Sequence, residues 1–257
     1  MISLISPAKN LNYKDPCPME LNSQLRFQPQ TKQLADFMKH YEPDEFATIM
    51  KISSKLAQQV FEYYLNFEPD HYTKENAKQA IFAFNGDVYR GIQAPTLNQA
   101  QCEYAQNHLA ILSGLYGLIR PMDLVQPYRL EMGTKIHFKD GNLYDFWQRT
   151  ITQQLNQQLA EQQNKLIVNL ASNEYIKAVK KQEIQGHWLD IDFKEFKNDQ
   201  YRTIGIFAKK ARGLMVRYIL DHNVDDIEAL KAFDLENYRY HPKLSSQFKL
   251  TFTRIQP

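Results

Sequence analysis

The sequence has few cysteines and no long apolar run, and both absences narrow the class of protein. Only Cys17 and Cys102 occur among 257 residues, and their spacing suggests neither a disulfide framework nor a zinc site. Two free thiols are typical of a reducing compartment. No window approaches the roughly 18 apolar residues that a membrane-spanning helix needs, and Pro7 follows the first apolar residues too soon for a signal peptide. We therefore expect a cytoplasmic protein without a membrane partner.

An excess of charge of one sign is also lacking. The chain contains 31 Lys and Arg against 29 Asp and Glu, a formal net charge of +2 at pH 7. The whole-chain charge therefore identifies no partner, and an electrostatic argument must rest on local clusters. No internal repeat and no linker rich in glycine or serine divides the sequence. The simplest interpretation is one domain that covers residues 1–257.

Several common ligand-binding motifs are missing as well. There is no Walker loop and no G-x-G-x-x-G. Glu68 and His71 form E-x-x-H, but Pro69 interrupts any helix there, and a di-iron bundle needs two such motifs. Ser6 and Lys9 of "SPAK" match the S-x-x-K of serine acyl-transfer enzymes, but the companion K-T-G and S-D-N are absent. We therefore expect no metal and no cofactor, and we assign no catalytic residue.

Hydrophobic periodicity predicts an α/β fold of the mixed α+β kind. Strands are expected at residues 1–5, 165–172, 187–193, 201–207 and 247–254. Helices are expected at residues 31–67, 74–84, 98–112, 145–165 and from 208 onward. Ser53 or Ser54 could divide the first helix, and Thr73 and Asn98 are candidate N-caps for the next two. Because the elements interleave without a strict βαβ rhythm, we expect a mixed sheet surrounded by helices.

Turn residues predict the connections between these elements. Asp140-Gly141 predicts a hairpin over residues 134–146, and Asn198-Asp199 predicts a second hairpin. The stretch "FNGDVYRG" is expected to be a turn-rich link.

The stretch "IFAKKARGLMVRYIL", residues 206–220, gathers positive charge without any acid. Wound as a helix, it brings its four cations to one face; they are Lys209, Lys210, Arg212 and Arg217. No carboxylate occurs between residues 200 and 220, so no (i, i+4) pair within that window neutralises them. Either acids arrive through tertiary contacts, or an anion such as phosphate binds here. Gly213, in the middle of this helix, could let a ligand approach closely.

Two further strings carry candidate phosphate contacts. In "LSGLYGLIRP", Gly114 and Gly117 form a G-x-x-G after an expected helix, and Arg120 follows. Such a turn can clamp a nucleic-acid backbone, or it can be a plain helix C-cap. In "PYRLEMG", Arg129 and Glu131 either pair with each other or bind a ligand.

Two more strings place polar residues where ligands often bind. "FNGDVYRG" holds Asp87 and Arg90, which either satisfy a local turn or face a ligand. "NLASNEY" puts Glu174 just after a buried strand, where α/β sheets host ligands, although its Ser and Asn also suit helix caps. If the protein is an enzyme, the candidate carboxylates are Asp87, Glu131 and Glu174.

These strings together resemble a known family. "SPAK", "QAIFAFNGDVYRGIQA", "LSGLYGLIRPMDLVQPYRLEMGTKI", "NLASNEYIKAV" and "FAKKARGLMVRYIL" occur in the order that is typical of the YaaA peroxide-stress protein family. The resemblance implies a cytoplasmic bacterial protein of the oxidative stress response that limits free iron and the DNA damage it drives. It also implies a single α/β domain with a basic cleft and a helix-hairpin-helix element that binds DNA.

The resemblance also implies site residues. It places in the cleft Lys9, Arg129, Lys209, Lys210, Arg212 and Arg217. It suggests the hairpin at Gly114 to Gly117, although the usual hairpin has G-x-G, and we add Arg90 and Arg120 to the expected DNA contacts. Asn85 stands where the family has lysine, so one phosphate contact is expected to be lost.

The leading hypothesis is a DNA-binding protein with little sequence specificity. Basic residues without a base-reading module favour contacts to the phosphates of double-stranded or distorted DNA. The sequence leaves the oligomeric state open, and we favour a monomer. The alternative is an enzyme that acts on nucleic acid or a phosphorylated small molecule in the same cleft, with the three carboxylates as acid/base or metal-binding groups.

Overall fold

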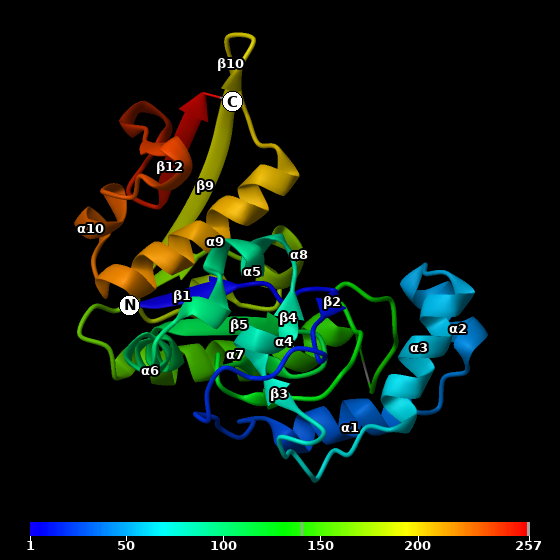
Figure 1. Cartoon of the computed structure of the whole chain (residues 1–257). Helices are drawn as coiled ribbons and strands as arrows, with labels where there is room; N and C mark the ends of the chain where they lie inside the picture. Colours follow the sequence, from blue (N-terminus) through cyan, green and yellow to red (C-terminus); the bar gives the residue numbers. More distant parts are fainter. Residues whose placement is uncertain (140, 256–257) are drawn as a thin grey trace.

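The computed structural model describes residues 1–139 and 141–255. Figure 1 shows a mixed sheet with helices packed around it, which confirms the α/β fold expected from the sequence. None of the helices in these ranges is both long enough and apolar enough to cross a bilayer.

The strands in chain order are β1 (Ile2–Ile5), β2 (Asn10–Leu11), β3 (Lys78–Gln79), β4 (Phe84–Asn85), β5 (Leu109–Ser113), β6 (Gly117–Ile119), β7 (Leu124–Val125), β8 (Leu166–Asn169), β9 (His187–Lys197), β10 (Gln200–Arg202), β11 (Arg239–Tyr240) and β12 (Lys249–Ile255). The helices are α1 (Gln28–Met38), α2 (Pro43–Met50), α3 (Ser54–Leu65), α4 (Ala80–Ala83), α5 (Asp87–Ile92), α6 (Gln99–His108), α7 (Leu143–Ala160), α8 (Asn173–Ile176), α9 (Gly205–His222) and α10 (Ile227–Lys231).

The main sheet has the order β11-β12-β9-β8-β1-β5-β6, with β10 paired to β9. Strands β5, β1, β8, β9 and β12 run parallel, and β6, β10 and β11 pair antiparallel with their neighbours. In the main sheet, the strand that follows β1 along the chain is β5, which lies on one side of β1. Strand β8 lies on the other side of β1, and the strand that follows it, β9, lies still farther from β1. Because these two connections diverge, the carboxyl ends of β1 and β8 form a topological switch point, where α/β sheets bind ligands.

Local signals that depend on neighbouring residues are confirmed. Ser53 caps α3, its Oγ accepting from the Leu56 backbone N–H at 3.4 Å. Asn98 and Gln101 form a capping box at the start of α6. The Asn198-Asp199 hairpin joins β9 and β10, and both residues have the positive φ that a type I′ turn requires.

Several predicted elements are wrong. The helix expected at 98–112 ends at His108, because the next five residues are the fully buried strand β5. The helix expected at 74–84 is replaced by β3 and the single turn α4, so Thr73 caps no helix. The link "FNGDVYRG" contains helix α5. The strand expected at 201–207 ends at Arg202, and α9 begins at Gly205.

The hairpin expected over residues 134–146 is also wrong. Only an isolated bridge joins Phe138 to Gly141, and α7 begins at Leu143 behind its cap Asn142. The turn residue Asp140 lies outside the described residues.

Candidate functional site

A pocket of about 300 Å³ opens at the carboxyl ends of β1 and β8. Its walls come from residues 6–10, 85–90 and 128–131, from parts of 170–175, and from Lys209 and Arg212 of α9. Each of these segments overlaps one of the five strings that carry the family resemblance. The fold therefore brings together, at the switch point between two parallel strands, segments that are far apart in the chain.

Two serines fasten the loops that follow β1 and β8. The Ser6 Oγ accepts from the Ser172 backbone N–H at 2.9 Å and lies 3.3 Å from the Ser172 Oγ. The Tyr89 hydroxyl of α5 donates to the Ser6 carbonyl oxygen at 3.1 Å. Ser6 of "SPAK" therefore holds three walls of the pocket in place.

Glu131 is the centre of an ion cluster on one wall. Its Oε1 lies 3.1 Å from the Arg129 Nη2 and 3.6 Å from the Lys9 Nζ. The side chains of Arg129 and Glu131 are only 12% and 13% exposed, whereas that of Lys9 is 66% exposed. Of the two interpretations of "PYRLEMG", the local ion pair is thus present, and it lies in the pocket itself.

The other two candidate carboxylates also line the pocket. Asp87 forms an ion pair with Arg90 within α5. The Glu174 Oε1 accepts from the Gly133 backbone N–H at 3.1 Å. Asp87, Glu131 and Glu174 therefore converge on one hollow, as the enzyme alternative requires. No group of three His, Cys, Asp or Glu side chains in the described ranges is arranged to hold a metal ion.

Arg212 and Lys209 are the two pocket cations for which the described residues supply no hydrogen bond and no ion pair. The Arg212 Nε is buried and has no hydrogen-bond partner in the described part of the chain. Burial lowers the pKa of the Arg212 guanidinium, and the charge of Asp192 opposes that shift. Lys209, one turn earlier on α9, is exposed at the same pocket. A partly buried guanidinium without an acid is stabilised when an anion binds beside it.

The other two cations of α9 do not line the pocket. Lys210 forms an ion pair with Glu236, whose carboxylate also lies 3.0 Å from the Arg254 Nη1. Arg217 is paired with Asp221, its Nε lying 2.8 Å from the Oδ1.

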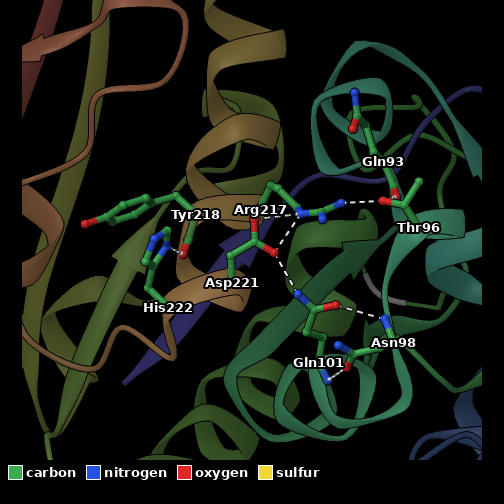
Figure 2. A network of polar contacts seen from close by, with 8 residues as sticks. All are labelled: Gln93, Thr96, Asn98, Gln101, Arg217, Tyr218, Asp221 and His222. Carbon is green, nitrogen blue, oxygen red and sulfur yellow. Dashed lines mark hydrogen bonds and ion pairs between the residues drawn. The ribbon is translucent and has the colours of Figure 1, made fainter.

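Figure 2 shows that Arg217 belongs to a structural network. Its guanidinium also donates to the Thr96 Oγ1, and the Gln101 Nε2 donates to the Asp221 Oδ1 at 2.7 Å. These bonds fasten the C-terminal half of α9 to the connection between α5 and α6, through Thr96, and to α6, through Gln101. For Lys210 and Arg217 the structure therefore shows acids from outside the acid-free window, because Glu236 arrives through the fold and Asp221 directly follows the window.

Gly213 serves helix packing rather than a ligand. A Cβ at this position would lie 1.9 Å from the Val88 carbonyl oxygen of α5. The expectation of a close ligand approach at Gly213 is wrong because another helix already occupies that space.

The segment proposed as a helix-hairpin-helix turn is a buried β-hairpin. Gly114 directly follows β5, Gly117 is the first residue of the antiparallel strand β6, and both glycines are buried. A Cβ on Gly114 would lie 2.2 Å from the Leu130 carbonyl oxygen, and Gly117 has φ of +72° against the Trp147 ring. Glycine is needed here for packing and backbone conformation, and the segment has no amide surface for a phosphate.

Arg120 is likewise a structural residue. Its Nη2 lies 2.8 Å from the Oδ1 of Asp123, and its Nε donates to the same oxygen at 3.0 Å. Asp123 is fully buried and also accepts from the Ser23 hydroxyl at 2.6 Å. Arg120 therefore neutralises a buried carboxylate, and it does not line the pocket.

Sequence reasoning missed the aromatic residues of the pocket. Tyr89, Tyr128 and Tyr175 line it, and burial raises the pKa of each phenol, so they stay neutral. The Tyr128 hydroxyl is 2.8 Å from the Ser113 Oγ. Each tyrosine lies within one of the strings that carry the family resemblance. The proximity of these tyrosines to the charged residues is the sequence feature that could have assigned them to the pocket.

Comparison with known proteins gives a consistent result over almost the whole chain. A family model described as "Peroxide stress protein YaaA" matches residues 1–244. The chain is 52% identical over 254 residues to a UPF0246 protein of Francisella philomiragia subsp. philomiragia, a match that covers 99% of this chain and 100% of the relative. It is 50% identical over 257 residues to a UPF0246 protein of Francisella tularensis subsp. novicida, with the same coverage.

Proposed function

This chain belongs to the peroxide stress protein YaaA family, and we propose that it acts in the peroxide stress response as a cytoplasmic DNA-binding protein. It binds DNA phosphates at the mouth of the pocket, with little sequence specificity, and it limits free iron and the DNA damage that iron drives. The role in peroxide stress follows from the family. The contact with DNA is argued from the charges around the pocket.

The observation that carries the proposal is the state of Arg212. Its guanidinium lies in the pocket without an acid partner in the described ranges, and Lys209 is exposed beside it. Guanidinium matches the geometry of a phosphate through paired N–H donors, and an ammonium adds an adjustable point charge. Lys9 and Arg90 are mostly exposed at the same pocket, so a backbone that crosses its mouth meets further positive charge.

The size of the pocket limits how DNA binds. A volume of about 300 Å³ is at the lower end of the range for small-molecule sites and cannot enclose a duplex. A duplex therefore lies across the opening, and one phosphate or one distorted nucleotide enters. Contacts of this kind position the protein without reading the bases, which explains the low sequence specificity.

A salt series on labelled duplex DNA tests the proposal. With two to five phosphates neutralised, the logarithm of the affinity should fall against the logarithm of salt with a slope of about −2 to −4.5. Lys209→Ala combined with Arg212→Gln should weaken binding to unrelated sequences alike. Lys55→Ala, which removes an exposed cation of α3 away from the pocket, is the matched control. A flat salt dependence, or an equal loss in the control, would refute phosphate binding at this site.

The proposed effect on iron is tested separately in cells. A strain that lacks the protein should contain more free iron after exposure to hydrogen peroxide, measured by electron paramagnetic resonance of chelated iron. Unchanged free iron would remove that part of the proposal and leave DNA binding standing.

A second function is favoured by the three carboxylates in the pocket. Glu131 and Glu174 lie among cations at a switch point, an arrangement that suits acid/base catalysis on a phosphorylated substrate. In this alternative the protein is an enzyme that acts on nucleic acid or a phosphorylated small molecule. Labelled DNA or nucleotide incubated with protein and magnesium would be converted by an enzyme, and Glu131→Gln would abolish the conversion. Recovery of unchanged substrate would exclude this alternative for the compounds used.

A further inference from the structure

The charges that line the pocket do not balance. Its lining includes five cations, which are Lys9, Arg90, Arg129, Lys209 and Arg212, and three carboxylates, which are Asp87, Glu131 and Glu174. At neutral pH this leaves an excess of two positive charges in one small hollow. An internal phosphodiester of DNA carries one negative charge, whereas a phosphate monoester carries about −1.5 to −2. The charge of the pocket therefore suits the monoester better.

We propose that the pocket binds a terminal phosphate monoester in preference to an internal phosphodiester. A terminal monoester is a phosphate held by a single ester bond, as in a free mononucleotide or at a phosphorylated strand end. The inference rests on the proposed function, because it names the form of phosphate that the same pocket accepts. It adds a selectivity that contact with the backbone of a continuous duplex does not require.

The shape of the pocket supports this preference. An internal phosphodiester is linked to a nucleotide on both sides. A site that encloses it therefore needs two openings, one for each flanking nucleotide. This pocket is bounded by the loops after β1 and β8, which the Ser6–Ser172 bond joins, and by α5 and α9. Its volume of about 300 Å³ is that of a small-molecule site. A monoester enters with its free oxygens first and needs only one opening.

The cations of the pocket differ in how freely they can bind the anion. Arg129 and Lys9 are held at Glu131, and Arg90 is held at Asp87, so these three shape the electrostatic field while they stay in place. Arg212 and Lys209 are three residues apart on α9 and therefore lie on the same face of the helix. The Arg212 guanidinium, which has no partner among the residues that the structure describes, can form two parallel hydrogen bonds to a phosphate.

The charge-assisted bonds predict a measurable difference between two probes of nearly equal size. Deoxyadenosine 5′-monophosphate is a monoester, and deoxyadenosine 3′,5′-cyclic monophosphate is a diester with one charge. By calorimetry near neutral pH, the monoester should bind the wild-type protein roughly tenfold to hundredfold more tightly. The advantage should shrink at about pH 5, below the second pKa of the monoester near 6. Equal affinity, or tighter binding of the cyclic compound, would overturn the proposal.

Two variants test whether the preference for the monoester arises in the pocket. Arg212→Gln should remove most of the advantage of the monoester, whereas Arg202→Gln should preserve it. Arg202 is an exposed arginine of β10 that does not line the pocket, so the control removes the same charge elsewhere. Loss of the preference in both variants would indicate a general charge effect and contradict the assignment. Because the comparison of probes uses the wild-type protein, it stands even if Arg212→Gln misfolds.

Three DNA substrates show whether the monoester is a strand end or a small molecule. They also test the monoester proposal separately from the DNA-binding proposal. A linear duplex with 5′-phosphate ends should bind more tightly than the same duplex with 5′-hydroxyl ends if the ligand is a strand end. If only the free mononucleotide shows the preference, the ligand is a small molecule, and both results support monoester binding.

Closed circular plasmid, which has no ends, tests DNA binding alone. Binding of plasmid without any preference between the nucleotide probes or between the duplex ends would overturn the monoester proposal and keep DNA binding. A preference for the monoester without plasmid binding would keep the monoester proposal and overturn DNA binding.

Discussion

Gly213 of α9 lies directly against Gly91 of α5, so that the two helices cross with backbone touching backbone. A Cβ on Gly213 would come within 2.9 Å of the Gly91 Cα and 1.9 Å of the Val88 carbonyl oxygen. This contact fixes the distance between two walls of the pocket, because α5 carries Asp87 and α9 carries Arg212. Small residues at a helix crossing let the backbones approach closely.

We predict that Gly213→Ala destabilises the protein. The added Cβ overlaps backbone atoms that cannot rotate away, and overpacking of this kind costs about 1–3 kcal/mol, which exceeds the gain of about 1 kcal/mol in helix propensity. Urea denaturation measures the change. Gly205→Ala is the matched control, since a Cβ there meets no atom within 4 Å. A Gly213→Ala protein as stable as the wild type would contradict the close crossing.

A buried ion pair joins the C-terminal strand to the long strand β9. The Arg254 Nε lies 2.9 Å from the Glu195 Oε2, and the side chains are 7% and 2% exposed. The Tyr238 hydroxyl also donates to this carboxylate. Removing the acid leaves a buried guanidinium short of a partner, so Glu195→Ala should lower the free energy of unfolding by about 3 kcal/mol.

The control for that prediction is an ion pair on the surface. Glu228 pairs with Lys231 at 2.7 Å but is 81% exposed, so Glu228→Ala should change stability by less than about 1 kcal/mol. Thermal and urea unfolding of both variants give the comparison. Equal losses in the two proteins would show that burial does not strengthen the Glu195 pair.

The sequence was sufficient for features that depend on residues close together in the chain. The caps Ser53 and Asn98 and the Asn198-Asp199 turn were predicted because side chain and partner lie within a few residues. Residues 109–112 of strand β5 fall in the helix predicted at 98–112, because a short run of apolar residues fits a buried helix and a buried parallel strand equally well. Only its pairing with β1, about a hundred residues away, decides between the two.

The sequence grouped some residues that also lie together in the structure, and their role in binding stays a prediction. Lys9, Arg129 and Arg212 were assigned to one cleft, and they do line one pocket. Two neighbours on the same helical face have acidic partners outside the pocket: Lys210 pairs with Glu236, far along the chain, whereas Arg217 pairs with Asp221, four residues further along α9. The Lys210 partner becomes visible only when the chain is folded, whereas the Arg217 partner stands at the (i, i+4) spacing that the sequence already contains.

We predict that His108 makes the stability of the protein depend on pH. Burial lowers the pKa of His108, the nearby N-terminal ammonium lowers it further, and the hydrogen bond from its Nδ1 to the Met1 carbonyl and the charge of Asp225 oppose the shift. Its ring stacks on Tyr104 at 4.0 Å. The unfolded chain therefore takes up the proton more readily than the folded one, so stability should fall as pH drops below about 6.5.

The measurement is the free energy of unfolding at a series of pH values between neutral and mildly acidic. His108→Gln should flatten the fall, because glutamine carries no titrating group and can still donate to the Met1 carbonyl oxygen. His40→Gln, at an exposed position of the surface, is the control. If the slope of the His108→Gln protein equals that of the wild type, another group accounts for the acid sensitivity.

Arg212 and Arg217 lie on the same helix, and the structure predicts opposite results when each is replaced by glutamine. Arg217 is paired with Asp221 and bonded to Thr96 (Figure 2), so Arg217→Gln should lower stability by roughly 0.5–1.5 kcal/mol and leave phosphate affinity unchanged. Arg212 has no protein partner in the described ranges, so Arg212→Gln should weaken phosphate binding with little loss of stability. Thermal unfolding and calorimetry with deoxyadenosine 5′-monophosphate on both variants test this.

The two variants change the net charge of the protein equally, so a general electrostatic effect predicts equal losses of affinity in both. A ligand that lies along the whole basic face of α9 also predicts equal losses. A loss of affinity confined to Arg212→Gln, together with a loss of stability confined to Arg217→Gln, is expected only if the fold has divided the basic face into a structural half and a binding half. Weaker phosphate binding by a well-folded Arg217→Gln protein would therefore contradict the division, and the binding surface would extend to the end of the helix.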